Sequence, residues 1–398
     1  MFTGKHILLG VTGGIAAYKS CELIRALVKM NAGVRVVMSD AATKFVTPLT
    51  FETLTEHPVS IDPFENRTVH IDLARWADCI LVCPATLNTI GKIANGIADN
   101  LLTTLISAAT EPVIICPAMN VEMYRNPLFQ TNVKKLADNQ YHFVDPGQGE
   151  LACGEHGWGR LAEVKDIIDA LKSVLLGTQD LAGTRVTVTA GPTRESIDPV
   201  RMLTNHSSGK MGFALAEAAA LRGADVTLIS GPTELEPMNG IGIVSVESAQ
   251  QMHDAVFDKW DITDVLIMAA AVSDYRPSQM STHKLKKKDD ESGLDLKLER
   301  TPDILYEAGM QKGKRLLVGF ALETENGVEN ARKKLAKKNL DYIVLNNALE
   351  EGAGFRSDSN RVTILSKEGA EAVELPSLSK QAVAEKIIDM IIGRLTDA

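Results

Sequence analysis

A single cysteine stands among glycines near the middle of the chain, in the stretch LACGEHGWGR (residues 151–160). This stretch is too rich in glycine for the interior of a helix or a strand. The sequence has five cysteines but no Cys-x-x-Cys pair, and Cys79, Cys83 and Cys116 fall in apolar runs, where cysteine behaves as a small hydrophobic residue. A disulfide framework or a zinc site is therefore not expected. Cys153 is either a structural thiol or a thiol that takes part in chemistry.

Glycines also mark a turn that could hold a phosphate. The segment GVTGGIAAYK places Gly13 and Gly14 between a predicted strand and a predicted helix. Backbone N–H groups at such a turn, together with the helix N-terminus, suit a phosphate group. The GxGxxG fingerprint of dinucleotide sites is absent, so a mononucleotide fits better than NAD. A tight turn without a ligand is the alternative explanation of these glycines.

Polar residues follow other predicted strands of the first half. The segment PATLNT offers Thr86 and Thr89 at the start of a helix, and PAMN places Met119 and Asn120 at another strand end. His70 stands just before a helix-like segment. Taken alone, such a histidine is more often a surface or capping residue than a catalytic one.

The second half contains a polar, glycine-containing loop, TAGPTRESIDPVRMLTNHSSGKMG (189–212), between a strand and a helix. It fails the GxxxxGK[ST] pattern of a P-loop. If Gly209 and Lys210 were the Gly-Lys pair, Thr204 would stand at the opening glycine and Met211 would replace Ser or Thr. A long capped loop is the simpler explanation of this segment by itself.

Charged residues downstream are open to the same two explanations. Asp274 follows a predicted buried strand, and THKLKKKDDESG (282–293) is a charge run whose ordinary explanation is a solvated loop. Lys334 and Lys338 are four residues apart and fall on one face of a predicted helix. Either a binding site or plain surface solvation accounts for these side chains.

Alternating strand and helix patterns must position all of these residues. Strand patterns recur at 5–14, 34–39, 77–86 and 112–120, and again at 184–191, 225–231, 264–272, 315–322 and 341–346. Helix periodicity is found at 15–30, 87–109 and 211–223. We therefore predict two α/β domains, 1–180 and 181–398, each a mainly parallel sheet flanked by helices. Ligands of such sheets bind at the carboxyl ends of the strands, where the polar residues described above fall.

Composition limits the class of partner. The 398 residues carry a net charge of −9, which argues against a broad nucleic-acid surface and leaves small molecules as the expected partners. No apolar run approaches the roughly 20 residues that a membrane span needs, and no secretory signal is recognised at the N-terminus. A cytoplasmic location without membrane attachment is expected.

Several motifs occur in one order that resembles a known family. GGIAAYK, the His70 segment, PATLNT, PAMNVEMY and ACGEHGWGR resemble the flavin-dependent cysteine decarboxylases. The second half resembles a CTP-dependent ligase, and the two halves together resemble the bifunctional coenzyme A biosynthesis proteins. The resemblance implies a flavodoxin-like or Rossmann-like flavoprotein domain followed by a Rossmann-like ligase domain. Tyr124 stands where related peptide decarboxylases often have Trp, which weakens a peptide substrate.

The resemblance implies that the first half binds FMN and decarboxylates 4'-phosphopantothenoylcysteine to 4'-phosphopantetheine. It implies that His70 acts on the reacting substrate, that Asn120 binds its carboxylate or amide, and that Cys153 donates a proton late in the cycle. The residues expected to hold FMN are Gly13, Gly14, Ile15, Ser39, Thr86, Thr89 and Met119.

For the second half, the resemblance implies that CTP activates 4'-phosphopantothenate as an acyl-cytidylate, which cysteine then attacks. Asn205 and Arg201 are expected to contact this intermediate, and Lys284 to stabilise the transition state. The residues expected to contact CTP are Ala270, Asp274, Lys284, Pro302, Asp303, Ile304, Leu305, Phe320, Lys334 and Lys338. Mg²⁺ is expected with the triphosphate, its protein ligands being unknown. A homo-oligomer is also implied, with trimers of the flavin domain, dimers of the ligase domain and a dodecamer as the assembly that both contacts would build.

Two other functions remain open from the residues. One is an NAD(P)-linked oxidoreductase with two Rossmann-like domains, against which the missing GxGxxG counts. The other is a flavin-binding regulatory protein, against which the joint presence of His70, Asn120 and Cys153 counts.

Overall fold

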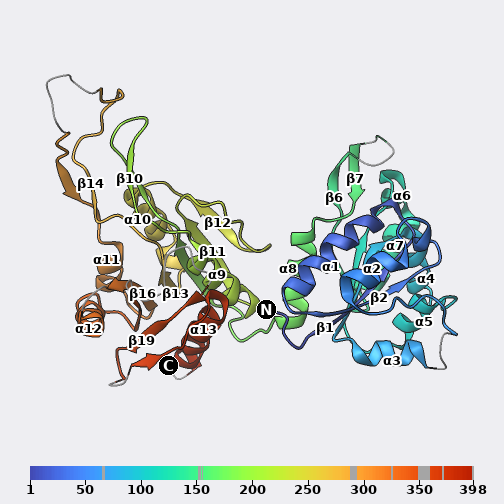
Figure 1. The fold of residues 1–398 in the computed structure, drawn as a ribbon. Helices are drawn as coiled ribbons and strands as arrows, with labels where there is room; N and C mark the ends of the chain where they lie inside the picture. The colour runs from blue at the N-terminus through green and yellow to red at the C-terminus, as the bar shows by residue number, and fades with distance from the viewer. Residues whose placement is uncertain are drawn as a thin grey trace. The chain divides into compact units, whose positions relative to one another are not determined.

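The computed structural model describes residues 1–64, 68–150, 154, 156–286, 294–323, 326–347, 359–369 and 372–396. The chain forms two compact units, Met1–Leu176 and Gly177–Ala398 (Figure 1). Each unit is built around its own sheet, and the α/β fold class predicted from the sequence is confirmed.

The first unit has a five-stranded, fully parallel sheet of order β2-β1-β3-β4-β5. Its central strands read as continuous apolar runs because helices cover both faces and no strand face meets water. The strands are β1 (His6–Val11), β2 (Gly33–Met38), β3 (Cys79–Ala85), β4 (Val113–Pro117) and β5 (His142–Phe143).

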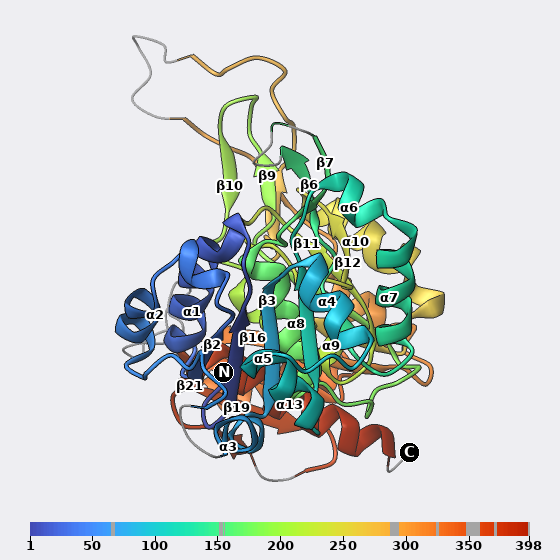
Figure 2. The ribbon, with the colours of Figure 1, turned by 90° about the vertical axis from the view of Figure 1, so that its right-hand side faces the viewer.

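Helices lie on both faces of this sheet (Figures 1 and 2), and a cluster of buried hydrophobic residues fills the space on each side. One face packs on α1 (Ser20–Lys29), α2 (Pro48–Thr55) and α8 (Val164–Leu176). The opposite face packs on α3 (Val69–Trp76), α4 (Leu87–Ala94), α5 (Leu101–Ala108) and α7 (Pro127–Ala137). Shorter elements complete the unit: η1 (Ile15–Lys19), η2 (Ala42–Lys44), α6 (Val121–Arg125) and the antiparallel pair β6 (Gly147–Glu150) and β7 (His156–Arg160).

One predicted helix of the first unit is wrong in extent. The periodicity suggested a single helix over 87–109, whereas the chain forms α4 and α5 with a break between them. Gly96 in the break has a φ of 68°, and Asn100 starts α5 through a capping box with Thr103. The left-handed Gly96 and the cap at Asn100 thus divide the helix, although the apolar periodicity continues across the break.

The second unit has an eight-stranded sheet of order β12-β11-β8-β13-β16-β17-β19-β20, of which the first six strands are parallel. The strands are β8 (Arg185–Ala190), β11 (Asp225–Ser230), β12 (Gly242–Ser245), β13 (Val265–Met268), β16 (Leu316–Glu323), β17 (Tyr342–Asn347), β19 (Val362–Ser366) and β20 (Val373–Glu374). In chain order the parallel strands read 3-2-1-4-5-6, so the order reverses between β8 and β13. The strand predicted over 264–272 ends at Met268, which leaves its polar continuation free to line a site.

Helices again cover both faces (Figure 1). One face packs on α9 (Lys210–Leu221) and α13 (Lys380–Thr396), and the other on α10 (Ala249–Asp258), α11 (Ile304–Met310) and α12 (Gly327–Lys337). The remaining elements are η3 (Trp260–Ile262) and three two-stranded sheets, β9 (Arg194–Ser196) with β10 (Met202–Thr204), β14 (Tyr275–Pro277) with β15 (Leu298–Arg300), and β18 (Ser359–Asn360) with β21 (Leu378–Ser379). Within the described ranges no helix has the length and apolar character needed to cross a membrane.

Candidate functional sites

The first unit has a cavity of about 720 Å³ at the carboxyl ends of β1 and β3, where the strand order reverses. The two strand ends are tied together by Thr12, whose hydroxyl donates to the carbonyl of Pro84 at 2.8 Å and accepts from the N–H of Thr86 at 3.0 Å. This bridge fixes the glycine turn after β1 beside the first residue after β3.

Five of the seven residues predicted to hold FMN line this cavity: Gly13, Gly14, Ile15, Thr86 and Met119. Asn120, which is predicted to bind the substrate, lines it as well. The two glycines have different structural reasons. A Cβ on Gly13 would lie 2.4 Å from the Cβ of Ala41, so Gly13 permits close packing within the protein. A Cβ on Gly14 would meet nothing closer than 3.7 Å, so the backbone there is open to a ligand.

The other two predicted flavin residues lie next to the cavity and do not line it. Thr89 is buried, and its backbone N–H donates to the hydroxyl of Thr86, which caps α4. The Ser39 hydroxyl accepts from the N–H of Ala42 at 3.3 Å. In the structure these two residues form hydrogen bonds with nearby residues, and their contact with a cofactor stays a prediction.

The pair β6 and β7 closes one side of the cavity. The N–H of Met119 donates to the carbonyl of Gly159 at 2.9 Å. Gly159 has a φ of 131°, and a Cβ there would lie 2.2 Å from the carbonyl oxygen of Met119. A Cβ added to Gly157 would lie 2.8 Å from Cγ2 of Val121. This glycine-rich stretch was not expected to form a strand, yet both glycines are in β7, where they allow tight packing against the segment that carries Asn120.

One predicted catalytic residue, His70, does not line the cavity, and another falls outside the part of the chain that the structure describes. His70 lies half-buried in the first turn of α3, which packs against α5, and it is absent from the cavity lining. Cys153 lies outside the described residues. Asn120 does line the cavity, and its side-chain oxygen accepts from the N–H of Glu122 at 2.8 Å.

The second unit has two adjoining cavities along the carboxyl ends of its parallel strands. The nucleotide cavity, as we call the first, measures about 710 Å³, and nine of the predicted CTP residues line it: Ala270, Asp274, Pro302, Asp303, Ile304, Leu305, Phe320, Lys334 and Lys338. The second, the acyl cavity, measures about 400 Å³ and is lined by Asn205 and by the Ser207–Gly212 segment that begins α9. Ala270, Val272, Asp274, Phe320 and Lys334 line both cavities, which are therefore continuous.

Carboxylates hold the two predicted lysines of the nucleotide cavity. The ammonium of Lys338 lies 2.7 Å from Asp303, and that of Lys334 lies 2.6 Å from Glu323. Asp303 also caps α11 by accepting from the N–H of Tyr306. These pairs pre-position the cations at the wall of the cavity, and a phosphate entering there would exchange one anionic partner for another.

Asn205 is positioned by backbone carbonyls. Its side-chain nitrogen donates to the carbonyl of Ala271 at 3.1 Å and to that of Val272 at 3.3 Å. These carbonyls come directly after β13, so the side chain of Asn205 lies near the point where the strand order reverses, between β8 and β13.

Arg201 and Lys284 do not line either cavity, but one buried carboxylate connects them. Asp198, whose side chain is fully buried, accepts from the N–H groups of Val200, Arg201 and Leu285 and from the guanidinium of Arg201 at 2.7 Å. Burial acts to raise the pKa of Asp198, but these hydrogen bonds hold that pKa well below its usual range. Asp198 thereby anchors Leu285, the residue after Lys284. The sequence did not predict a role for this aspartate because only the fold brings it to Leu285.

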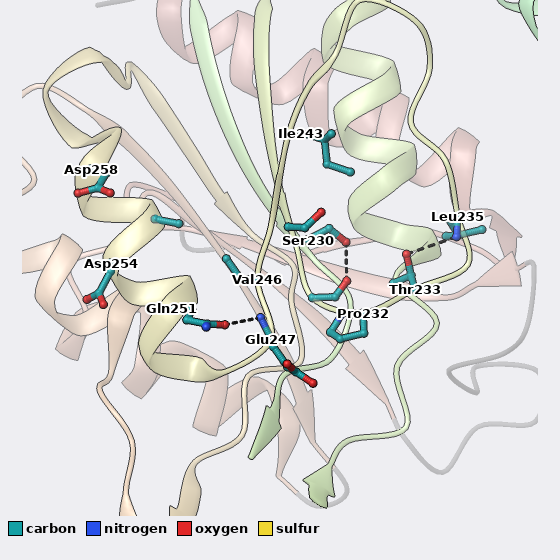
Figure 3. A pocket seen from close by; sticks show the side chains of 13 residues that line it. Ser230, Pro232, Thr233, Leu235, Ile243, Val246, Glu247, Gln251, Asp254 and Asp258 are labelled. Atoms are coloured by element: carbon teal, nitrogen blue, oxygen red, sulfur yellow. Dashed lines mark hydrogen bonds between the residues drawn. The ribbon is translucent and has the colours of Figure 1, made fainter. Parts of the chain in front are cut away.

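A third cavity, of about 830 Å³, lies beyond the carboxyl ends of β11 and β12 (Figure 3). None of the residues predicted from the sequence line it. Several of its polar groups form local bonds: Gln251 accepts from the N–H of Glu247 at 2.7 Å, and Ser230 donates to the carbonyl of Gly231 (Figure 3). Most of the residues predicted for this unit line the nucleotide and acyl cavities instead.

Comparisons with known proteins agree with this division. The family model described as "DNA/pantothenate metabolism flavoprotein C-terminal domain" matches residues 181–395, and that described as "Flavoprotein" matches residues 1–176. The chain is 49% identical to the Coenzyme A biosynthesis bifunctional protein CoaBC of Bacillus subtilis (strain 168), over 98% of this chain and 97% of the relative. Identity to the protein of the same name from Escherichia coli (strain K12) is 41%, over 98% and 97% of the two chains.

Solved structures include the C-terminal domain of a CoaBC protein. It is 46% identical, covers 56% of this chain and 100% of its own, and has a TM-score of 0.48. With full-length relatives well above 30% identity, the family is established: the chain belongs to the bifunctional coenzyme A biosynthesis proteins, with a flavoprotein half and a pantothenate-metabolism half.

Proposed function

We propose that this chain converts 4'-phosphopantothenate, cysteine and CTP into 4'-phosphopantetheine in two steps, ligation in the second unit and decarboxylation in the first. The observation that carries the proposal is the nucleotide cavity, where nine residues expected to contact CTP gather from four separate segments. The family membership and the cavity of the flavoprotein half support the second step.

In the ligation step, the pantothenate carboxylate attacks the α-phosphate of CTP, and pyrophosphate leaves. The nucleoside would lie against the 302–305 segment, and the phosphates would cross Phe320 towards the first turn of α9. A helix N-terminus and nearby lysines favour such an anion. Asn205 would contact the acyl group, and Lys284 would neutralise charge in the transition state.

Mg²⁺ is expected with the nucleotide. Among the described residues, no group of three or more His, Cys, Asp or Glu side chains is arranged to hold a metal ion. We therefore expect the ion to be bound chiefly by triphosphate oxygens and water.

FMN fits the cavity of the first unit. The cavity offers the open backbone at Gly14, the hydroxyl of Thr86 and apolar contacts from Ile15 and Met119. When bound, FMN would supply the redox chemistry that makes loss of CO₂ possible. Asn120 would orient the substrate, His70 would act on the reacting group, and the thiol of Cys153 would donate a proton.

The proposal is tested on the purified protein. We expect a yellow preparation or one that takes up FMN, and pyrophosphate release from CTP only when 4'-phosphopantothenate is present. A colourless protein that cannot be reconstituted would refute the flavin half, and absence of pyrophosphate would refute the ligase half.

We also infer a homo-oligomer working in the cytoplasm, with trimers of the flavin unit and dimers of the ligase unit. Ile15, Tyr18 and Met123 line the flavin cavity yet are 59%, 55% and 44% exposed, which fits a surface that another copy or a ligand covers. Light scattering at several protein concentrations will show whether the mass is that of a monomer, which would contradict this inference.

Replacing Gly159 with alanine should destabilise the flavin unit. The added Cβ would collide with the Met119 carbonyl in a backbone region that disfavours side chains, so we expect a loss of about 1–3 kcal/mol in the free energy of unfolding. Gly149→Ala is the matched control, because the nearest atom to its Cβ would be 3.6 Å away. Denaturant unfolding and FMN retention measure both variants, and equal stability would show that β7 is not packed as described.

Replacing Asp198 with asparagine should slow the ligase about tenfold, the effect of losing one charge-assisted hydrogen bond, and leave decarboxylation unchanged. The new amide nitrogen would face the N–H of Leu285 and the Arg201 guanidinium, so the segment carrying Lys284 loses its anchor. Exposed Asp295→Asn is the control.

The pH dependence of this variant has a definite sign. The folded pKa of Asp198 is lowered, so its stabilisation is present above the ordinary pKa of about 4 and is lost as the pH falls through the folded value. We expect a constant difference in unfolding midpoint between parent and variant from pH 6 to 8, and convergence only in strong acid. A difference that varied across neutral pH would contradict the assignment.

A further inference from the structure

Two buried amide oxygens in the second unit have no hydrogen-bond partner within the described part of the chain. They are the side-chain oxygens of Asn346 and Asn360, and both residues line the acyl cavity. Asn360 is only 5% exposed. A buried acceptor without a donor is unfavourable, so its retention at a cavity wall indicates a donor on a ligand.

The fold brings a cation to the same wall. Asn346 is the last residue but one of β17 and pairs with Val362, which is two residues after Asn360, so the register brings both asparagines to the same part of the sheet edge. Asn360, in β18, pairs with Leu378, in β21. Lys380 is two residues after Leu378 and is the first residue of α13. Lys380 is 8% exposed and lines the acyl cavity. We call Asn346, Asn360 and Lys380 the cavity floor.

The floor combines two acceptors with one ammonium. The amide nitrogen of Asn360 donates to the sulfur of Met211 at 3.9 Å, which leaves its oxygen as the group without a partner among the described residues. In this orientation a phosphate, which offers mainly acceptors, would face the amide oxygens unfavourably. An α-amino acid offers both kinds of group, because its carboxylate suits the ammonium and its amine N–H groups suit the amide oxygens. Asn205, which is expected to contact the acyl group, lines the same cavity.

We propose that the cavity floor is the binding site of the amino-acid substrate, cysteine, with Lys380 holding its carboxylate and Asn346 and Asn360 holding its amine. This inference rests on the ligase function proposed above. The amine nitrogen attacks the acyl carbon, a C–N bond forms, and the bond from that carbon to the phosphate oxygen breaks. CMP leaves with the electron pair, and the nitrogen loses two protons to solvent.

The test separates the two half-reactions. Without cysteine, CTP and 4'-phosphopantothenate should give one burst of pyrophosphate, which reports the first step alone. With cysteine, amide formation reports the second. Cysteamine serves as a second nucleophile because it has the amine and the thiol of cysteine and lacks the carboxylate.

In Lys380→Met, we expect the KM for cysteine to rise about tenfold to a hundredfold, the effect of losing a hydrogen bond to a charged group. The pyrophosphate burst, the KM for CTP and the rate with cysteamine should not change, so the preference for cysteine over cysteamine disappears. Asn360→Leu should raise the KM for both amines. Lys380→Arg keeps the positive charge and Asn360→Asp keeps an oxygen acceptor, so each should recover most of the affinity for cysteine.

A loss of the burst or a raised KM for CTP or 4'-phosphopantothenate, with the KM for cysteine unchanged, would overturn the inference and assign the floor to a phosphate. The intact burst also shows that each variant is folded. If the parent protein itself released no pyrophosphate with both substrates, the proposed ligase function would fail, an outcome distinct from failure of the floor.

Discussion

Asn205→Asp is expected to lower the rate of amide formation by roughly 10²–10³, while the flavin half keeps full activity. The asparagine side-chain nitrogen donates to the carbonyls of Ala271 and Val272. A carboxylate in that place would set oxygen against oxygen, leave its position and bring a negative charge towards the acyl phosphate. The acyl-cytidylate should then accumulate, because it is formed but poorly used.

Quenched-flow samples analysed for pyrophosphate, acyl-cytidylate and amide will measure this effect. Exposed Asn239→Asp is the matched control, as it introduces the same charge into the same unit away from both cavities. If decarboxylation of added 4'-phosphopantothenoylcysteine fell in parallel with ligation, two independent sites could not be maintained.

His70→Asn is expected to abolish decarboxylation, by a factor of about 10²–10⁴, and to spare ligation. An imidazole can exchange a proton near neutral pH, whereas the amide of asparagine fills similar space and cannot. The experiment is informative because His70 does not line the flavin cavity of a single chain.

Release of CO₂ from 4'-phosphopantothenoylcysteine measures the first activity, and pyrophosphate release measures the second. His57→Asn, at an exposed position in the same unit, controls for loss of a histidine as such. Retained decarboxylation in His70→Asn would remove this residue from the mechanism and return it to a structural role in α3.

Most of the helices and strands, and the ends of the strands where the predicted site residues lie, could be predicted from the sequence. Apolar runs predicted the parallel strands because buried strands have no polar face, and the polar residues that follow them line the cavities as expected. The 302–305 segment lies around the start of α11 and Phe320 lies in β16, and it was the family resemblance that joined them. The fold places them in one cavity.

Other features required the fold itself. Asp198 looks like an ordinary loop residue until Leu285 is brought onto its carboxylate. No sequence motif marks Asn346 and Asn360, because what distinguishes them is a buried side-chain oxygen that has no donor among the residues the structure describes. The break between α4 and α5 was missed because apolar periodicity continues across it, and only the cap at Asn100 marks the second start.

The central claim is that one chain joins cysteine to 4'-phosphopantothenate with CTP and then removes the cysteine carboxyl group. It is tested most directly by incubating the FMN-loaded protein with CTP, Mg²⁺, 4'-phosphopantothenate and cysteine labelled with ¹³C at the carboxyl carbon. We predict labelled CO₂ in equal amount to pyrophosphate, and none when either CTP or 4'-phosphopantothenate is omitted. Pyrophosphate without labelled CO₂, or labelled CO₂ without CTP, would contradict the account.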